Sequence, residues 1–272
     1  MKWVTFVQQD KSALGQLRDG RVIDVSAGRW SDLGAYLAAG APEIRADGPD
    51  YALEEVRLAA PVPRPPKVVA VGLNYRDHAE EQAKVTPDYP MFFSKARTCV
   101  IGPDETILLP EGRKYIDVEV ELAAVIGRGG SNIPRERALE HVFGFTIMND
   151  VSDRKAQKDD RQYYRAKSFP TFGPCGPLVI TPDEFDHHHA DIRLRLNDRV
   201  QQESNTRYMM FTVEVLIELL SGFQELEPGD ILTTGTPGGV GVFRDPPVYL
   251  QDGDVVECEI SGLGKLTNPV KR

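Results

Sequence analysis

The sequence lacks the features that mark several large classes of protein. Its three cysteines, Cys99, Cys175 and Cys258, are far apart and show no Cys-x-x-Cys spacing, so neither a disulfide framework nor a zinc ribbon is expected. No window approaches the roughly 18 apolar residues of a membrane span, and the start, MKWVTFVQQD, has no long apolar stretch of the signal-peptide kind. We therefore expect a cytoplasmic protein with no membrane partner.

Basic charge is also scarce. Lys and Arg together number 32 against 41 Asp and Glu, which gives a net charge of −9. Nucleic-acid binding draws much of its affinity from basic surfaces, so a nucleic-acid partner is not expected. The segment 233–241 is rich in glycine and threonine, but it lacks the Lys of a P-loop and the Gly-x-Gly-x-x-Gly spacing of dinucleotide sites. Nucleotide binding is therefore unsupported.

The length and the prolines predict the organisation of the chain. A chain of 272 residues is long enough for one large domain with a small appendage. The proline-dense segment 60–66 stiffens the chain and removes hydrogen-bond donors, which predicts a small N-terminal domain over 1–65 and a main domain over 66–272. Strand-like segments outnumber helical ones and do not alternate with them, so the expected fold class is α+β rather than a doubly wound sheet.

Apolar periodicity and turn residues predict the elements. The first domain is expected to hold a strand over 2–8, a hairpin turn at Asp19-Gly20 and a helix over 33–39. In the main domain, alternation and apolar runs predict strands, while i, i+3, i+4 spacing predicts a helix closed by Gly222. These elements are strands over 68–73, 91–94, 106–109, 117–126, 145–150 and 255–260, and helices over 134–142 and 213–220.

The acidic stretch 115–122, YIDVEVEL, carries the strongest chemical signal. Side chains alternate along a strand, so Asp117, Glu119 and Glu121 are expected on one face. Carboxylates two residues apart lie roughly 7 Å apart and repel unless solvent or a cation separates them. The pattern is typical of a solvated acidic face or of a site for Mg²⁺, Mn²⁺ or Ca²⁺. Asp150, at the end of an apolar strand, is either a turn former or a third ligand.

Three further groups of residues could carry chemistry. His78 and Glu81 are neighbours on a helical turn, where Glu81 could orient the imidazole as a general base; a surface ion pair has the same spacing. Lys167, set among aromatic residues, glycine and prolines, is a candidate for holding an anion or acting as an acid, and otherwise a solvated lysine. The histidine tract 187–189 is expected to be loop surface, because adjacent residues in regular structure cannot all point at one ion.

Together these segments resemble the fumarylacetoacetate hydrolase family, in its bacterial branch. The resemblance extends from about residue 68 to the C-terminus, and the segment before it fits the variable first domain of this branch. The matching segments, in the family's order, are Val71-Gly72-Leu73-Asn74-Tyr75 with His78 and Glu81, Glu119-Val120-Glu121-Leu122, Asn149-Asp150-Val151-Ser152 with Gln157, Lys167-Ser168-Phe169, and Gly229-Asp230 with Thr234-Gly235-Thr236-Pro237.

The resemblance implies a β-rich catalytic domain that usually dimerises, so a homodimer is expected. It also implies a divalent cofactor, Mg²⁺ or Mn²⁺, with Ca²⁺ as a further candidate. By position it assigns three groups of residues: the metal ligands Glu119, Glu121 and Asp150; the catalytic residues His78, Glu81 and Lys167; and the substrate-side residues Tyr75, Gln157, Gly235 and Thr236. The sequence departs from the family pattern at Asp153-Arg154-Lys155-Ala156 and at Pro170, and both departures are candidates for altering substrate choice.

The implied substrates are small 2-oxo or diketo acids. A divalent ion would polarise the keto oxygen and stabilise an enolate, His78 with Glu81 would activate water, and Lys167 would stabilise the developing anion or supply a proton. The expected activity is hydrolysis of a C–C bond in acylpyruvate-like acids. The alternatives are an isomerase or decarboxylase acting on 2-hydroxyhepta-2,4-diene-1,7-dioate-like acids in aromatic catabolism, and a non-catalytic dimer that binds metal and acid.

Overall fold

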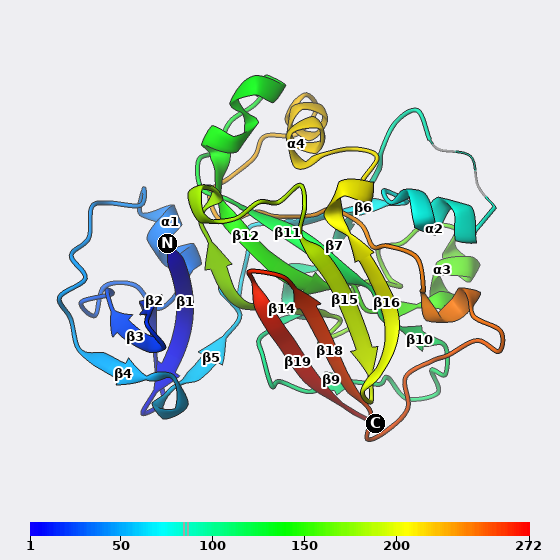
Figure 1. Ribbon diagram of the computed structural model, residues 1–272, viewed down its shortest axis with the longest axis horizontal. Coiled ribbons are helices and arrows are strands. Elements are labelled where there is room, and N and C mark those ends of the chain that lie inside the picture. The colour runs from blue at the N-terminus through cyan, green and yellow to red at the C-terminus, as the bar shows by residue number, and fades with distance from the viewer. Residues whose placement is uncertain (84, 86) are drawn as a thin grey trace.

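One long sheet runs through the chain in the computed structural model, which describes residues 1–83, 85 and 87–272 (Figure 1). Its strands follow the order β4-β3-β2-β1-β14-β12-β11-β17-β6-β7, with β5 paired to β1 and β8 to β14. These strands are β1 (Lys2–Gln8), β2 (Lys11–Arg18), β3 (Arg21–Asp24), β4 (Asp50–Ala52), β5 (Arg57–Ala59), β6 (Val68–Gly72), β7 (Met91–Lys95), β8 (Val100–Ile101), β11 (Val120–Ile126), β12 (Val142–Asn149), β14 (Gly173–Ile180) and β17 (Ile231–Thr233).

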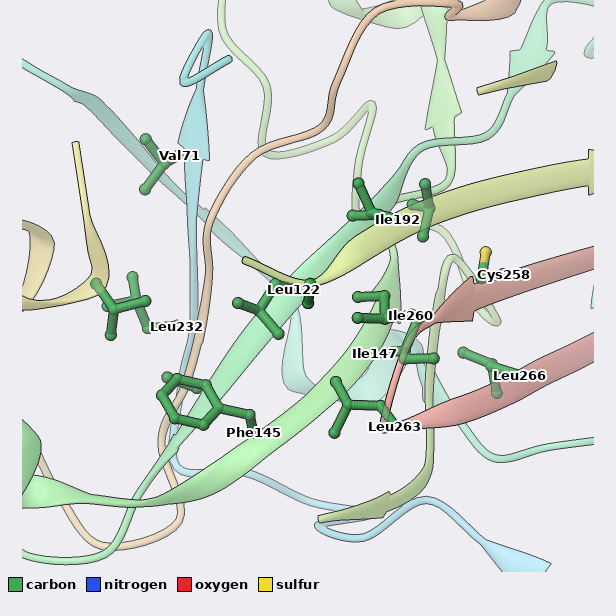
Figure 2. Packing of buried hydrophobic residues seen from close by; sticks show 14 of the residues in the cluster. Val71, Leu122, Phe145, Ile147, Ile192, Leu232, Cys258, Ile260, Leu263 and Leu266 are labelled. Atoms are coloured by element: carbon green, nitrogen blue, oxygen red, sulfur yellow. The ribbon is translucent and has the colours of Figure 1, made fainter. Parts of the chain in front are cut away.

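A second sheet packs on the first and lies in front of β11 and β12 in Figure 1. Its order is β16-β15-β18-β19-β9. The strands are β9 (Ile107–Leu108), β15 (Asp191–Leu196), β16 (Arg199–Asn205), β18 (Val255–Ile260) and β19 (Gly264–Lys271). A short ladder joins β10 (Ile116–Asp117) to β13 (Ser152–Asp153). Figure 2 shows the core between the two large sheets, where Leu122 and Phe145 of the first meet Ile192 and Ile260 of the second.

Helices are short and few among the described residues. The α-helices are α1 (Leu33–Ala38), α2 (Arg76–Glu81), α3 (Arg154–Asp160) and α4 (Val213–Ser221). The 3-10 turns are η1 (Leu53–Glu55), η2 (Arg97–Cys99), η3 (Arg135–His141), η4 (Pro182–Glu184), η5 (Thr206–Tyr208) and η6 (Gly241–Phe243). None of these helices is long and apolar enough to cross a membrane. The predicted α+β class is confirmed, because two packed sheets dominate and the helices do not alternate with their strands.

The central strand β11 has both faces buried. Leu122, Ala124 and Ile126 join the core between the two sheets, whereas Ala123 and Val125 pack on the opposite side with the aromatic residues of the N-terminal segment. Each large apolar side chain buried in this way contributes about 1.5–3 kcal/mol to folding. Because both faces are buried, every residue of this strand after Glu121 is apolar.

The predicted single strand over 117–126 is wrong, because the structure breaks it into β10 and β11. At the break, side chains replace the backbone ladder: Val118 N donates to Asp117 Oδ1 (2.9 Å) and Glu119 N donates to Asn149 Oδ1 (3.1 Å). Asp117 therefore does not share a face with Glu119 and Glu121. Its carboxylate instead accepts from the backbone of Gly241, at 3.1 Å. The predicted helix over 134–142 is a 3-10 turn, η3.

The N-terminal strands extend the sheet of the main domain. Strand β1 pairs antiparallel with β14, matching Lys2 with Ile180 and Trp3 with Val179. The helix α1 begins as expected, since the side chain of Asp32 accepts from Ala35 N at 2.9 Å. The division of the chain at residue 65 stays a prediction, and a backbone ladder crosses it.

Candidate active site

A cavity of about 730 Å³ is lined by residues from the end of β6, from α2 and α3, and from the segment 236–243. Figure 1 shows β6, α2 and α3 on the same side of the molecule. The wall of the cavity includes Glu119, Glu121 and Asp150, together with His78 and Lys167. Strand ends, loops and short helices supply these side chains, so the rigid sheet fixes the position of the acidic residues. The structure thus brings the predicted metal ligands, His78 and Lys167 to one cavity, whereas Glu81 does not line it and contacts His78 instead.

The pairing of β11 with β12 explains how the carboxylates meet. The two strands are antiparallel with Val120 opposite Asn149, and one step further Asp150 N donates to Glu119 O at 2.8 Å. Oxygen atoms of Glu119, Glu121 and Asp150 all lie within 4.8 Å of one another, and all three residues are buried. The alternative of a solvated acidic face therefore does not hold.

Three buried or half-buried cations compensate this acidic cluster. Lys167 Nζ lies 2.5 Å from Glu119 Oε2 and 2.5 Å from Asp150 Oδ2. Lys95 Nζ donates to Asp150 Oδ1 at 2.6 Å, and Arg154 Nη2 donates to Glu119 Oε1 at 2.6 Å. Removing one partner of such a buried pair is costly, because the other charge is left without compensation.

Sequence reasoning did not assign a role to Lys95 or Arg154. In the structure Lys95 follows Phe93 by two residues in β7 and therefore shares the face that turns toward the cavity. Arg154 lies in the segment that departs from the family pattern. It pairs with Asp117 (3.0 Å) as well as with Glu119, so it links the two acids that the broken strand separates.

The cluster shifts the pKa values of Glu119 and Glu121 in opposite directions. Burial, Asp150 and Glu119 raise the pKa of Glu121 to about 8, although Lys167 opposes the shift. Burial also disfavours the Glu119 carboxylate, but Arg154 and Lys167 outweigh it and hold its pKa well below the ordinary value. Carboxylate oxygens are the ligands of hard divalent cations. Because an added cation would relieve the repulsion that raises the pKa of Glu121, the three carboxylates fit such an ion.

Metal affinity should therefore depend on pH. Glu121 must lose its proton to bind a cation, so the affinity for Mg²⁺ or Mn²⁺ should rise about tenfold per pH unit and level off above about pH 8. Without metal, the folded protein holds this proton more tightly than the unfolded chain does. Its unfolding free energy should then fall as the pH rises from about 4.5 to about 8. Calorimetric titration with Mn²⁺ at several pH values tests this, and an affinity independent of pH would contradict it.

His78 is oriented by two residues that follow it in the chain, Glu81 and Gln82. His78 Nδ1 lies 3.0 Å from Glu81 Oε2, and Nε2 lies 2.8 Å from Gln82 Nε2. An ionised carboxylate only accepts, so Nδ1 carries the proton and Nε2 is the basic nitrogen that accepts from the Gln82 amide. Glu81 is fixed in turn, because its Oε1 accepts from Gly239 N at 3.0 Å.

Gln82 is a positioning residue that sequence reasoning missed. Replacing it with leucine should lower kcat about two- to tenfold, the loss expected for one hydrogen bond of about 0.5–1.5 kcal/mol, with little change in KM. Gln82→Glu places a second carboxylate on the imidazole and stabilises its protonated form, so the acid limb of the pH–rate profile should move to higher pH. Identical profiles for the wild type and both variants would show that Gln82 only fills space.

The predicted substrate-side residues separate into two pairs. Gln157 and Thr236 line the cavity. Tyr75 is fully buried and does not line it, and its hydroxyl finds no hydrogen-bond partner within the described part of the chain. Gly235 supports a carboxylate instead, because its N–H donates to Glu121 Oε2 at 3.0 Å. Aromatic residues that sequence reasoning did not single out, Phe93, Tyr163 and Phe243, complete the apolar wall.

A cavity that combines buried carboxylates, a held imidazole base and a buried lysine has the chemistry of a small-molecule enzyme. Residues 67–271 match the family described as Fumarylacetoacetate (FAA) hydrolase C-terminal, and residues 1–61 match the one described as Rv2993c-like, N-terminal. The chain belongs to the fumarylacetoacetate hydrolase family.

Relatives of this family resemble the chain over most of its length. The mitochondrial oxaloacetate tautomerase of Xenopus laevis is 46% identical over 218 residues, which are 79% of this chain and 68% of that protein. Fumarylacetoacetate hydrolase from Exiguobacterium antarcticum is 38% identical with a TM-score of 0.92, over 100% of this chain and 99% of that one. The 2-hydroxyhepta-2,4-diene-1,7-dioate isomerase from Mycobacterium marinum is 33% identical with a TM-score of 0.85, over 100% and 98%.

Proposed function

We propose that the protein is a divalent-metal-dependent tautomerase that interconverts the keto and enol forms of oxaloacetate-like 2-oxo dicarboxylic acids. The observation that carries the proposal is that the imidazole of His78, oriented by Glu81 and Gln82, and the buried carboxylate cluster share the wall of one cavity. The 46% identity to a protein named oxaloacetate tautomerase supports this reaction.

The chain's residues supply the proton chemistry of this reaction. Tautomerisation removes a proton from C3 of the 2-oxo acid and returns a proton to the oxygen on C2. His78 Nε2 is the base for the first step, in which the substrate's C3–H replaces the Gln82 amide N–H as the partner of this nitrogen, and Glu81 stabilises the imidazolium that results. A divalent ion held by Glu119, Glu121 and Asp150 would supply Lewis-acid polarisation of the 2-oxo group.

Lys167 acts as a fixed positive charge in this proposal. Burial lowers its pKa, but Asp150 and Glu119 outweigh burial and raise the pKa above its ordinary value. An ammonium held by two carboxylates is a poor proton donor. It stabilises negative charge that develops on the substrate oxygen. Of the two roles that the resemblance implied for Lys167, we therefore propose anion stabilisation rather than proton donation.

The cavity wall also offers a site for a second carboxylate. Lys158 of α3 lines the cavity, is exposed, and forms no ion pair with an acid of the described residues. On the same helix, Gln157 Oε1 accepts a hydrogen bond from Arg154 Nη1 at 3.1 Å. A free ammonium at the mouth of the cavity attracts an anion, which favours a dicarboxylic acid over a monocarboxylic one.

The size of the cavity favours a second candidate, hydrolysis of a C–C bond in an acylpyruvate. Cavities of roughly 300–1,000 Å³ hold drug-sized ligands, and the volume of about 730 Å³ here exceeds what a four-carbon acid fills. The same volume suits isomerisation of 2-hydroxyhepta-2,4-diene-1,7-dioate, the substrate in the name of the Mycobacterium marinum relative. Hydrolysis also requires that His78 activate a water molecule.

Ultraviolet assays separate these reactions. Enol-oxaloacetate, an acylpyruvate series and a 2-hydroxydienedioate are each followed with Mn²⁺ and again with a chelator. Metal-dependent decay of the enol absorbance, with total oxaloacetate conserved, is the result expected. Metal-dependent pyruvate release from an acylpyruvate would support the hydrolase instead, and an enol decay that the protein does not accelerate would overturn the tautomerase.

We also propose that the protein is a homodimer, as the family resemblance implies. Light scattering on the eluted protein should give twice the mass of the chain. Cytoplasmic location stays a prediction, because the Xenopus relative is named as mitochondrial.

A further inference from the structure

The histidine tract 187–189 lies in a turn after η4, and two of its imidazoles face one carboxylate. His187 Nε2 lies 2.9 Å from Glu214 Oε1, and His188 Nε2 lies 3.2 Å from the same oxygen. The tract is a loop, as expected, but the expectation of surface is wrong for His187, which is only 5% exposed. The three imidazoles do not all face one point, because His189 pairs with Asp186 instead, but two neighbours in this turn do share one carboxylate.

The three atoms have the spacing of ligands around one small ion. Ligands on a tetrahedron with bonds of about 2.0–2.1 Å, the lengths found for zinc, lie roughly 3.3–3.4 Å apart. The two nitrogen–oxygen distances here are 2.9 and 3.2 Å, and all three ligand atoms lie within 4.8 Å of one another. Small side-chain movements would therefore bring them to zinc-binding distances.

Hydrogen bonds alone leave this cluster incompletely satisfied. The two imidazole rings lie close, with centroids 4.0 Å apart, and both face one carboxylate oxygen. Glu214 Oε2 is buried and has no hydrogen-bond partner in the described ranges. A buried carboxylate oxygen without a partner is positioned to bind a cation.

We propose that His187, His188 and Glu214 form a second metal site, which binds Zn²⁺. Imidazole and carboxylate together suit zinc, whereas the all-carboxylate cluster of the cavity suits harder ions. None of the three residues lines the active-site cavity. The half-exposed His188 leaves one coordination position open to solvent, and the ion would tie the turn after η4 to the first turn of α4.

Cobalt provides the test, because Co²⁺ replaces Zn²⁺ and its visible absorption intensifies in a tetrahedral site. Metal-free, untagged protein is titrated with Co²⁺ and then with Zn²⁺ as a competitor. The variant Glu121→Gln removes a carboxylate of the active-site cluster and should keep the tetrahedral band. Glu214→Gln and His188→Ala should each weaken this binding at least tenfold.

His189→Ala is the matched control, because His189 belongs to the same tract but pairs with Asp186 at 3.0 Å. It should bind Co²⁺ as the wild type does. Circular dichroism of each metal-free variant confirms that it is folded. The proposal is overturned if no tetrahedral band forms, or if the band persists unchanged in both Glu214→Gln and His188→Ala.

Discussion

Replacing Glu121 with glutamine should lower turnover by about 10²–10³-fold and leave the unfolding free energy at neutral pH almost unchanged. The pKa of about 8 means that Glu121 carries a proton in the metal-free protein at neutral pH. Glutamine has the shape of that neutral form, and its oxygen can still accept from Gly235 N. What the variant loses is the anionic oxygen that a divalent cation needs.

Glu119→Gln is the informative comparison, because it removes the neighbouring carboxylate with the same change of shape. Glu119 pairs with both Lys167 and Arg154, so this variant removes a negative partner from two buried positive charges. It should lose turnover and also about 3–5 kcal/mol of stability. Denaturant unfolding and Mn²⁺ calorimetry distinguish the two variants. A Glu121→Gln protein that turns over and binds Mn²⁺ normally would show that the carboxylates do not form the metal site.

Replacing His78 with alanine should lower kcat by about 10²–10⁴-fold, the contribution typical of a general base. The basic nitrogen Nε2 has no substitute at its place, whereas the acidic cluster does not contact it and should keep its metal affinity. Glu81→Gln should give a smaller loss, because the imidazole stays but loses the carboxylate on Nδ1. Steady-state kinetics with the enol substrate and Mn²⁺ calorimetry measure both effects.

Two controls make the His78 result specific. Glu80→Gln changes an exposed carboxylate on the same helix and should leave kcat unchanged. Added imidazole should restore part of the activity of His78→Ala, because the deleted side chain leaves a space open to the cavity. If His78→Ala keeps more than a tenth of wild-type kcat, another group is the base.

The local patterns in the sequence predicted much of the fold. The predicted strands over 2–8 and 255–260 coincide with β1 and β18, and the helical spacing that ends at Gly222 coincides with α4. The secondary structure of each of these elements follows from the pattern of apolar residues within it. The break at Val118 was not predictable in this way, because it depends on an oxygen that Asn149, thirty residues away, supplies to Glu119 N.

The site was predictable where one short segment contains both partners. His78 and Glu81 are three residues apart, and the alternation of Glu119 and Glu121 sits in one stretch. Lys95 could not be assigned, since its partner Asp150 is 55 residues away and most lysines are solvated. Tyr75 was expected to contact substrate, but the packing around it, which no local pattern reveals, buries its hydroxyl.

The ladder between β1 and β14 makes the first sixty residues a cover for the catalytic sheet. Trp3, Trp30 and Tyr36 pack with Val68, Ala123 and Val179 in one cluster. A chain beginning after the proline-rich segment would leave that apolar face in water and the β14 edge near Val179 and Ile180 unpaired. Exposed edges of this kind recruit strands from other molecules. Any sequence that replaces the N-terminal segment must therefore still supply a strand that pairs with β14 and an apolar face that covers the sheet. Only the residues of this segment that point away from the sheet are free to vary.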